Sequence, residues 1–183
     1  TARVTPAEVE GQTDGRVYAV YGVAVDDANG NVWVTNTRDD TVAVYRQSDL
    51  SLVKQFDKGV LPHGRDLVVD TKDNRVWASG FGGGKLVAFD AKTLGVGQDL
   101  TVESKVRGEE FGPMALALDP VAGELYSVGL STGEVVVLDG ATGAVDRMFR
   151  FPTVNGGIGV AIDPEGRRLY VAAQGSDNLV IAN

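Results

Sequence analysis

The side chains that could carry out chemistry gather in a few short segments. His63, the only histidine, lies in the turn LPHGRD beside Arg65 and Asp66. Imidazole titrates close to neutral pH, so His63 could act as a general base with one of these neighbours beside it. A single histidine in a polar turn is also common without any chemical role. The segment therefore leaves two interpretations open, a polar loop residue and a general base.

A glycine-rich segment, GFGGGK at residues 80–85, invites comparison with a phosphate-binding loop. Glycine backbone can approach an anion closely, and Lys85 would add a positive charge. The segment lacks the Gly-x-x-x-x-Gly-Lys-Ser/Thr pattern, and no helix is expected after it. We therefore predict a flexible loop between two strands. Phe81 has little local core to join, so it is expected to stack on a ligand or to cover one end of the fold.

The longest polar segment, TVESKVRGEEFGP, covers residues 101–113. Its charged side chains could form a rim around a site, with Arg107 among them, while Phe111 could point inward. The alternative is a solvated loop, because extra loop length is tolerated at little cost and only sometimes serves a function.

Four aspartates recur at similar spacing along the chain. Asp26, Asp70, Asp119 and Asp163 are separated by 44, 49 and 44 residues, and each ends an apolar run before a tight turn. Four carboxylates could converge on a metal ion. Their position before a turn instead predicts that they accept hydrogen bonds from the backbone N–H groups of that turn.

The same spacing extends to whole segments, which places these residues in a repeat. Each repeat has an apolar strand, a short turn, a second strand with a central aromatic residue, a polar loop, and further strands. Apolar residues recur with a period near two, which favours strands over helices. Four short strands in about 45 residues predict an all-β fold, a β-propeller built of four-stranded antiparallel blades. The repeats cover residues 22–56, 65–100, 114–149 and 158–183 of a single domain, 1–183.

Trp33, Trp77, Tyr126 and Tyr170 hold the same position in the four repeats. We expect them to pack between neighbouring blades rather than to line a binding site.

The second strand of the first repeat contains Val-Trp-Val-Thr-Asn at residues 32–36, and the segments GVAVD, GVAID and RRLYVAA accompany it. These segments resemble the consensus of the YVTN-type β-propeller repeat family. The resemblance covers residues 22–183, and it departs from the pattern in the second and third repeats, at WASGFGGG and YSVGLS. It implies a propeller, often of seven blades and commonly exported or at the cell surface of bacteria and archaea. It does not imply one activity, because propellers carry many functions.

In a propeller, the loops between blades and the loops between second and third strands lie at one end, which we call the top face. The side chains of the strands pack between blades, so ligand-contacting side chains are expected in these loops, around residues 36–40, 61–66, 79–84 and 101–113. The predicted ligand-binding residues are His63, Arg65, Phe81, Arg107 and Phe111.

Composition limits the function classes. The formal net charge of −8 disfavours nucleic acid and anionic membrane surfaces as partners. The chain contains no cysteine, which excludes disulfides, thiolate metal sites and cysteine nucleophiles. No apolar stretch is long enough to span a membrane, and none looks like a signal peptide. Because the chain begins with Thr1, we expect that a leader or a preceding region was removed, in keeping with an extracytoplasmic location.

Two functions from different classes remain open. The first is a noncatalytic scaffold that binds a small molecule, glycan or protein through the top-face loops, without a cofactor. The second is a hydrolase of the metal-dependent lactonase type, which would hold calcium in the central channel with oxygen ligands from several blades.

The last repeat ends after its third strand, whereas the others continue into a fourth. An incomplete ring exposes strand edges and apolar faces, so we predict that the chain is part of a larger propeller of about seven blades. The alternative is a closed four-bladed ring in which residues 2–9 or 16–20 complete the last blade.

Overall fold

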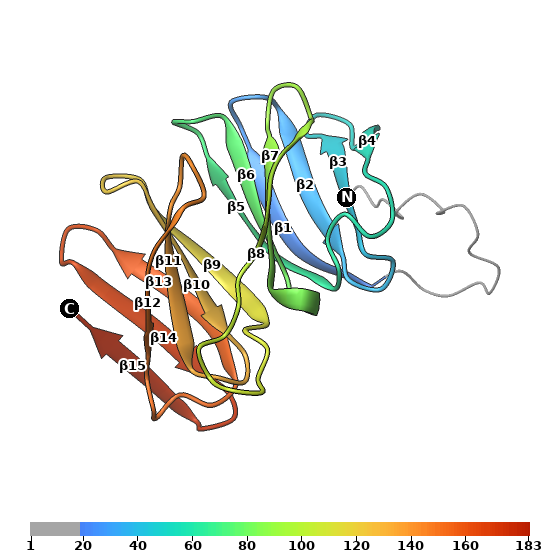
Figure 1. Cartoon of the computed structure of the whole chain (residues 1–183). Coiled ribbons are helices and arrows are strands. Elements are labelled where there is room, and N and C mark those ends of the chain that lie inside the picture. Colours follow the sequence, from blue (N-terminus) through green and yellow to red (C-terminus); the bar gives the residue numbers. More distant parts are fainter. Residues whose placement is uncertain (1–18) are drawn as a thin grey trace.

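The computed structural model describes residues 19–183, which form four antiparallel sheets arranged one after another along an arc (Figure 1). In each sheet the strands follow chain order, so every sheet is a simple meander. Blade 1 contains β1 (Val20–Asp26), β2 (Asn31–Asn36), β3 (Thr41–Arg46) and β4 (Leu52–Gln55). Blade 2 contains β5 (Gly64–Asp70), β6 (Arg75–Gly80), β7 (Lys85–Asp90) and β8 (Val96–Thr101). Blade 3 contains β9 (Pro113–Asp119), β10 (Glu124–Gly129), β11 (Glu134–Asp139) and β12 (Val145–Arg150). Blade 4 contains β13 (Gly157–Asp163), β14 (Arg168–Ala173) and β15 (Asn178–Ala182).

Consecutive blades meet along their first strands, with β1 beside β5, β5 beside β9 and β9 beside β13. The fold is therefore a partial β-propeller of about four blades, as the repeats predict. The closed four-bladed ring is not what the described residues form, because β1 and β13 do not pack side by side as consecutive first strands do. Val20 begins β1 of the first blade instead of completing the last one, and residues 2–9 and 16–18 lie outside the described residues.

The recurring aspartates end the first strands and shape the turns that follow them. The carboxylate of Asp70 accepts the backbone N–H groups of Lys72 and Asp73, and that of Asp119 accepts those of Val121 and Ala122. Asp26 and Asp163 accept N–H groups of their own turns in the same way. The predicted turn role is confirmed, and it keeps each first hairpin tight.

The core lies between the blades. The ring of Trp33 packs against those of Phe56 and Phe89, with centroid distances of 6.0 and 5.6 Å, and Trp77 is equally buried. Tyr126 is buried, whereas Tyr170 is half-buried, because no further blade among residues 19–183 packs on it. The expected packing between blades is thus confirmed for Trp33, Trp77 and Tyr126, and not for Tyr170.

Two hydroxyl groups join the first strands of neighbouring blades. Thr35 Oγ1 accepts the N–H of Gly22 at 2.8 Å and donates to the carbonyl oxygen of Arg65 at 2.7 Å. In the next blade, Ser79 Oγ accepts the N–H of Asp66 at 3.0 Å and donates to the carbonyl oxygen of Met114 at 3.3 Å. Thr35 and Ser79 hold the fifth position of β2 and β6, so the same bridge occurs twice. Each bridge fixes the offset between one first strand and the next.

Both ends of the arc expose apolar side chains. Val23 on β1 is 62% exposed and Leu179 on β15 is 61% exposed, with Val25 and Ile181 exposed beside them. Strands of this kind are covered on both faces inside the arc, so these two faces are suited to a further packing partner. No helix in residues 19–183 reaches the length and apolarity that crossing a membrane requires.

The inner-strand contacts predict an asymmetry between two equivalent glycines. Gly22 of β1 and Gly159 of β13 hold the same position, but a Cβ on Gly22 would overlap the carbonyl oxygen of Arg65. A Cβ on Gly159 would meet only the Cβ of Ala172, at 3.4 Å. We expect Gly22→Ala to lower the free energy of unfolding by about 1–3 kcal/mol and Gly159→Ala to change it little. Urea unfolding of the two variants measures this difference, and equal effects would contradict the close approach of β1 and β5.

Candidate functional site

In each blade, the first strand begins at the end of the blade where the second strand finishes. Gly64 pairs with Gly80, and Pro113 pairs with Gly129. The loops on either side of these residues therefore share one end of the blades, the top face. Loops 36–40, 61–66, 79–84 and 101–113 all belong to this end.

Arg65, the second residue of β5, is held between two aromatic rings. Its guanidinium carbon lies 4.8 Å from the ring centroid of Tyr21 and 5.7 Å from that of Phe81. Tyr21 comes from β1 and Phe81 from the loop after β6, so the stack spans two blades. Two of the predicted residues, Arg65 and Phe81, thus meet in space. We call Tyr21, Arg65 and Phe81 the arginine clamp.

The charge of Arg65 has no anionic partner within residues 19–183. Its Nη1 donates a long hydrogen bond, 3.4 Å, to Thr37 Oγ1, and its buried Nε has no hydrogen-bond partner. The adjacent carboxylate of Asp66 is hydrogen-bonded to backbone groups instead. It accepts the N–H groups of Leu67 and Leu116, both at 2.9 Å. Burial raises the pKa of Asp66 above its ordinary value, against the effect of these two hydrogen bonds. The half-buried guanidinium of Arg65 is therefore not neutralised by its neighbours.

His63 lies at the edge of the clamp with its backbone held on both sides. Its N–H donates to Asp40 Oδ1 at 2.7 Å, and its carbonyl oxygen accepts the N–H of Phe81 at 3.1 Å. The residue has a positive φ of 48°, and its side chain is exposed. No carboxylate is hydrogen-bonded to the imidazole in the part of the chain that the structure describes, so the structure gives His63 no general-base partner there.

The glycine-rich segment contains a short 3-10 turn. Residues Gly82–Gly84 form a single 3-10 turn, η1, with Gly83 and Gly84 at positive φ. This turn sets Phe81 against Gly112, where a Cβ would lie 2.8 Å from the ring. The segment lies between two strands, β6 and β7, as predicted, and its turn supports the ring of Phe81, which contacts Arg65.

The other two predicted residues lie apart from the clamp. Phe111 is only 1% exposed and belongs to the core cluster around Trp77, so its ring is a packing group with no face open to solvent. Arg107 is exposed and makes no hydrogen bond or ion pair with any residue in 19–183. The structure brings His63, Arg65 and Phe81 together and leaves Arg107 and Phe111 out.

The long loop at 101–113 is anchored by a carboxylate from the next blade. The buried side chain of Glu134 accepts the hydroxyl of Ser104 at 2.7 Å and the N–H of Lys105 at 2.8 Å. Sequence reasoning missed Glu134, Tyr21 and Thr37. Tyr21 precedes the repeat as the pattern defined it, and the other two act on residues far away in the sequence.

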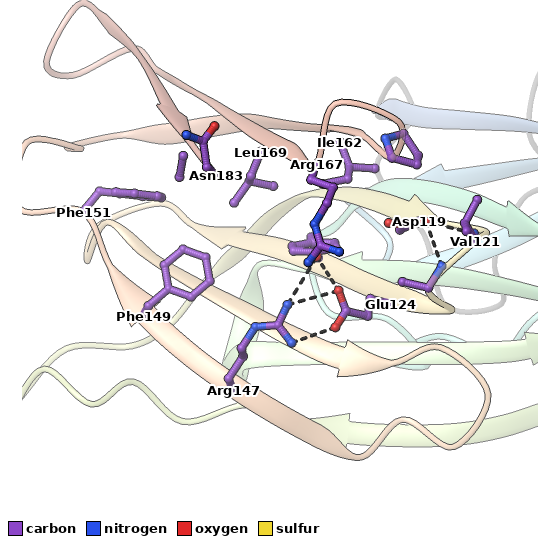
Figure 2. A pocket seen from close by; sticks show the side chains of 14 residues that line it. Asp119, Val121, Glu124, Arg147, Phe149, Phe151, Ile162, Arg167, Leu169 and Asn183 are labelled. Carbon is purple, nitrogen blue, oxygen red and sulfur yellow. Dashed lines mark hydrogen bonds and ion pairs between the residues drawn. The ribbon is translucent and has the colours of Figure 1, made fainter.

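A hollow lies between blades 3 and 4 (Figure 2). It has a volume of about 710 Å³. Phe149, Phe151, Ile162 and Leu169 make its apolar wall, and Glu124, Tyr126, Arg147 and Arg167 make its polar side. We call this hollow the blade 3–4 groove.

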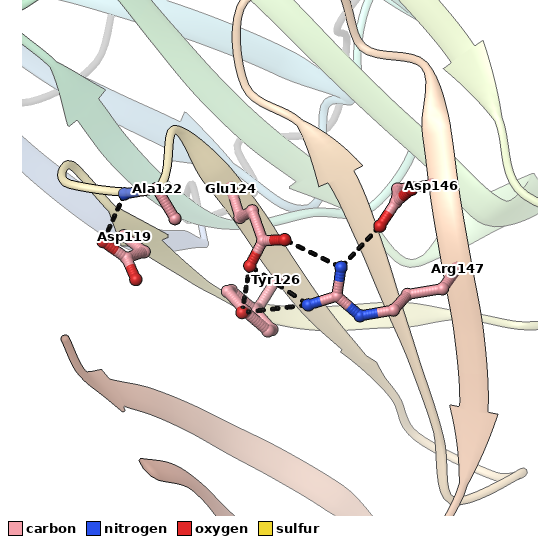
Figure 3. A network of polar contacts seen from close by, with 6 residues as sticks. All are labelled: Asp119, Ala122, Glu124, Tyr126, Asp146 and Arg147. Atoms are coloured by element: carbon pink, nitrogen blue, oxygen red, sulfur yellow. Dashed lines mark hydrogen bonds and ion pairs between the residues drawn. The ribbon is translucent and has the colours of Figure 1, made fainter. Parts of the chain in front are cut away.

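The polar side of the groove is a connected network (Figure 3). Arg147 forms a two-point contact with Glu124, with Nη1–Oε1 and Nη2–Oε2 distances of 2.7 and 3.1 Å. The hydroxyl of Tyr126 donates to the same carboxylate, at 2.5 Å. The bond to Arg147 lowers the pKa of Glu124, while burial and the Glu124 carboxylate raise the pKa of Tyr126 to about 12. Glu124 and Arg147 are charged at neutral pH, and Tyr126 carries its proton.

No group of three or more His, Cys, Asp or Glu side chains is arranged to hold a metal ion within residues 19–183.

Comparison with known proteins supports the fold. No family model matches the chain, and no curated protein does. Among solved structures, a putative 6-phosphogluconolactonase from Bacteroides uniformis matches with a TM-score of 0.74 and 14% identity, over 96% of this chain and 53% of the other. Hydrazine synthase from Kuenenia stuttgartiensis matches with a TM-score of 0.75 and 12% identity, over 96% of this chain and 48% of the other. A streptogramin B lyase matches with a TM-score of 0.70 and 15% identity, over 88% of this chain and 53% of the other. The chain thus spans about half the length of these structures, and the likeness shows a β-propeller fold alone.

The network around Tyr126 makes a prediction about its titration. Glu124→Gln removes the neighbouring negative charge, so the pKa of Tyr126 should fall from about 12 part of the way towards the ordinary 10. Burial, the larger cause, would remain. A raised phenol pKa also means that the folded state loses stability as the pH rises from 10 towards 12. Glu124→Gln should lose less stability over this pH range, because its Tyr126 pKa lies closer to 10. The ¹³C resonance of the Tyr126 ring carbon that bears the hydroxyl reports the titration directly. Glu103→Gln, in the exposed loop, is the control, and an unchanged midpoint in Glu124→Gln would contradict the network.

Proposed function

We propose that this protein is a noncatalytic binding scaffold that takes an anionic, ring-bearing ligand at the arginine clamp. The observation that carries the proposal is a half-buried guanidinium between two aromatic rings, without any carboxylate partner among the described residues. The location we propose is extracytoplasmic, as the resemblance to exported propellers implies.

The clamp suits an anion because of what surrounds Arg65. Stacking on Tyr21 and Phe81 orients the planar guanidinium, and a carboxylate can accept two parallel hydrogen bonds from such a group. Rings on both sides exclude part of the water, which strengthens a charge-assisted bond. The chain carries a net charge of −8, yet none of its described carboxylates pairs with this cation. A carboxylate from outside would fill that role.

The clamp also suits a ligand with a flat apolar part. Tyr21 is 57% exposed, so one face of its ring remains open to solvent beside the guanidinium. His63 offers an exposed imidazole next to the clamp. An aromatic carboxylate could therefore stack on Tyr21 while its charge meets Arg65, and no bond in the ligand need break.

A metal-dependent lactonase is the alternative, and one of the similar structures carries a lactonase name. Such an activity would need oxygen ligands that converge on one ion. Calcium and a chelator therefore belong in the melting assay, because an ion bound only by the folded state raises its stability. The scaffold proposal expects neither addition to change the melting temperature, and a clear rise with calcium would favour the lactonase.

The binding test uses benzoate as the probe and benzamide as its uncharged control. Benzoate should shift the amide resonances of Arg65 and Phe81 and the ring resonances of Tyr21 in a saturable way, and benzamide should do so at least about tenfold more weakly, because a charged partner strengthens the bond to guanidinium. Arg65→Gln should remove the effect of benzoate while melting close to the wild type, since the side chain has only weak polar contacts.

Arg107→Gln is the matched control, because it removes an exposed arginine of the top face that touches no aromatic ring among the described residues. It should leave benzoate binding unchanged. Equal binding of benzamide, or full benzoate binding by Arg65→Gln, would overturn the proposal.

A further inference from the structure

In blades 2 to 4, the residue before the first strand has a left-handed backbone. It is His63 before β5, Gly112 before β9 and Gly156 before β13, with φ of 48°, 55° and 68°. In each case its carbonyl oxygen accepts the N–H of the residue that follows the second strand, which is Phe81, Leu130 or Gln174. Glycine takes this backbone shape without steric cost, whereas a residue with a Cβ does not. His63 thus holds a position that glycine holds in the next two blades.

The exposed imidazole of His63 has no hydrogen bond or ion pair with any residue in 19–183, so no polar contact there offsets this cost. Three other non-glycine residues with positive φ do use their side chains. Asp40 accepts the N–H of His63, Asn74 accepts a hydrogen bond from the first hairpin turn of blade 1, and Leu94 packs in the core between blades 1 and 2. Backbone strain gathers at ligand sites, so the imidazole is suited to a group from outside the described residues.

The imidazole lies next to the arginine clamp. Its Nδ1 is 3.6 Å from the point that a Cβ on Gly82 would take, so the ring lies close to the residue that follows Phe81. The Cα atoms of His63 and Arg65 lie within about 7.6 Å of each other, because consecutive Cα atoms are about 3.8 Å apart. The imidazole and the guanidinium therefore both lie beside the segment Phe81–Gly82.

The backbone that carries the imidazole is fixed at three points. The N–H of His63 donates to Asp40 Oδ1 at 2.7 Å, and its carbonyl oxygen accepts the N–H of Phe81 at 3.1 Å. The preceding carbonyl oxygen, that of Pro62, accepts the N–H of Gly82 at 3.2 Å. Because the base of the side chain is already ordered, a ligand that meets the imidazole has less freedom to remove.

We propose that the arginine clamp takes aromatic dicarboxylates, an inference that rests on the proposed function. One carboxylate meets Arg65, the ring of the ligand lies on Tyr21, and the imidazole of His63 donates a hydrogen bond to the second carboxylate. Imidazole carries at least one N–H in either protonation state, so the donor is present on both sides of neutral pH. A hydrogen bond to a charged acceptor contributes more than one between neutral groups. The second contact therefore favours two carboxylates over one.

Phthalate, isophthalate and terephthalate test this inference, because they differ only in the separation of their two carboxylates. Benzoate is the reference with one carboxylate. At least one of the three should bind about tenfold or more tightly than benzoate, when the amide resonances of Arg65 and Phe81 are followed in a titration. His63 is the only histidine, so its imidazole resonances are identified directly. At saturation that dicarboxylate should shift them further than benzoate does.

Two variants localise the second contact. His63→Gly removes the imidazole and installs the residue that blades 3 and 4 have at this position. It should melt no lower than the wild type, because glycine suits the positive φ, and it should bind each dicarboxylate no more tightly than benzoate. Asp177→Gly is the matched control, since Asp177 is an exposed top-face residue of blade 4 with a φ of 49°. It should retain the preference for the dicarboxylate.

The wild type is first titrated with benzoate alone, and absence of binding at that stage would contradict the proposed function itself. A wild type that binds benzoate but binds none of the three dicarboxylates more tightly would overturn this inference alone. So would a His63→Gly variant that retains the full preference, or a dicarboxylate that leaves the imidazole resonances where benzoate leaves them.

Discussion

The arrangement of this protein depends on how each first strand is fixed against the next. Sheet hydrogen bonds hold strands together within a blade, but they do not cross between blades. At the first two junctions a buried hydroxyl makes the crossing, from Thr35 and from Ser79. Each hydroxyl accepts an N–H of its own blade and donates to a carbonyl oxygen of the next. The junction between blades 3 and 4 lacks this bridge, because the fifth position of β10 is Val128. Both hydroxyls are buried, so losing the hydroxyl would leave backbone donors and acceptors unsatisfied at a cost of about 1–3 kcal/mol each. Gly22 has no side chain, and this allows β1 to approach β5 closely.

The arginine clamp follows from this constraint. The residue whose carbonyl oxygen receives the Thr35 bridge is Arg65, so the bridge sets the position from which the Arg65 side chain extends. Tyr21 and Phe81 reach the guanidinium from two different blades, and their distances depend on the offset between those blades.

Much of the fold could be predicted from the sequence because its causes are local. Asp70 and Asp119 bind N–H groups two and three residues away, and the apolar pattern of each strand reports its own burial. The site was harder to predict. Phe81 and Phe111 both stand beside glycines, and only packing against Gly112 and Gly129 decides that one ring reaches Arg65 while the other enters the core. The bridge from Thr35 to Arg65 spans 30 residues, and the pair of Glu124 and Arg147 spans 23, so no short pattern signals them.

Amide hydrogen exchange at Gly22 and Asp66 tests whether the hydroxyl bridges fix the first strands, because these two N–H groups donate to the bridging hydroxyls. We predict that both N–H groups are as well protected as amides inside the β ladders, and that Thr35→Val speeds exchange at Gly22 and not at Asp66. Exchange at Gly22 as fast as in an exposed loop, or unchanged in Thr35→Val, would contradict it.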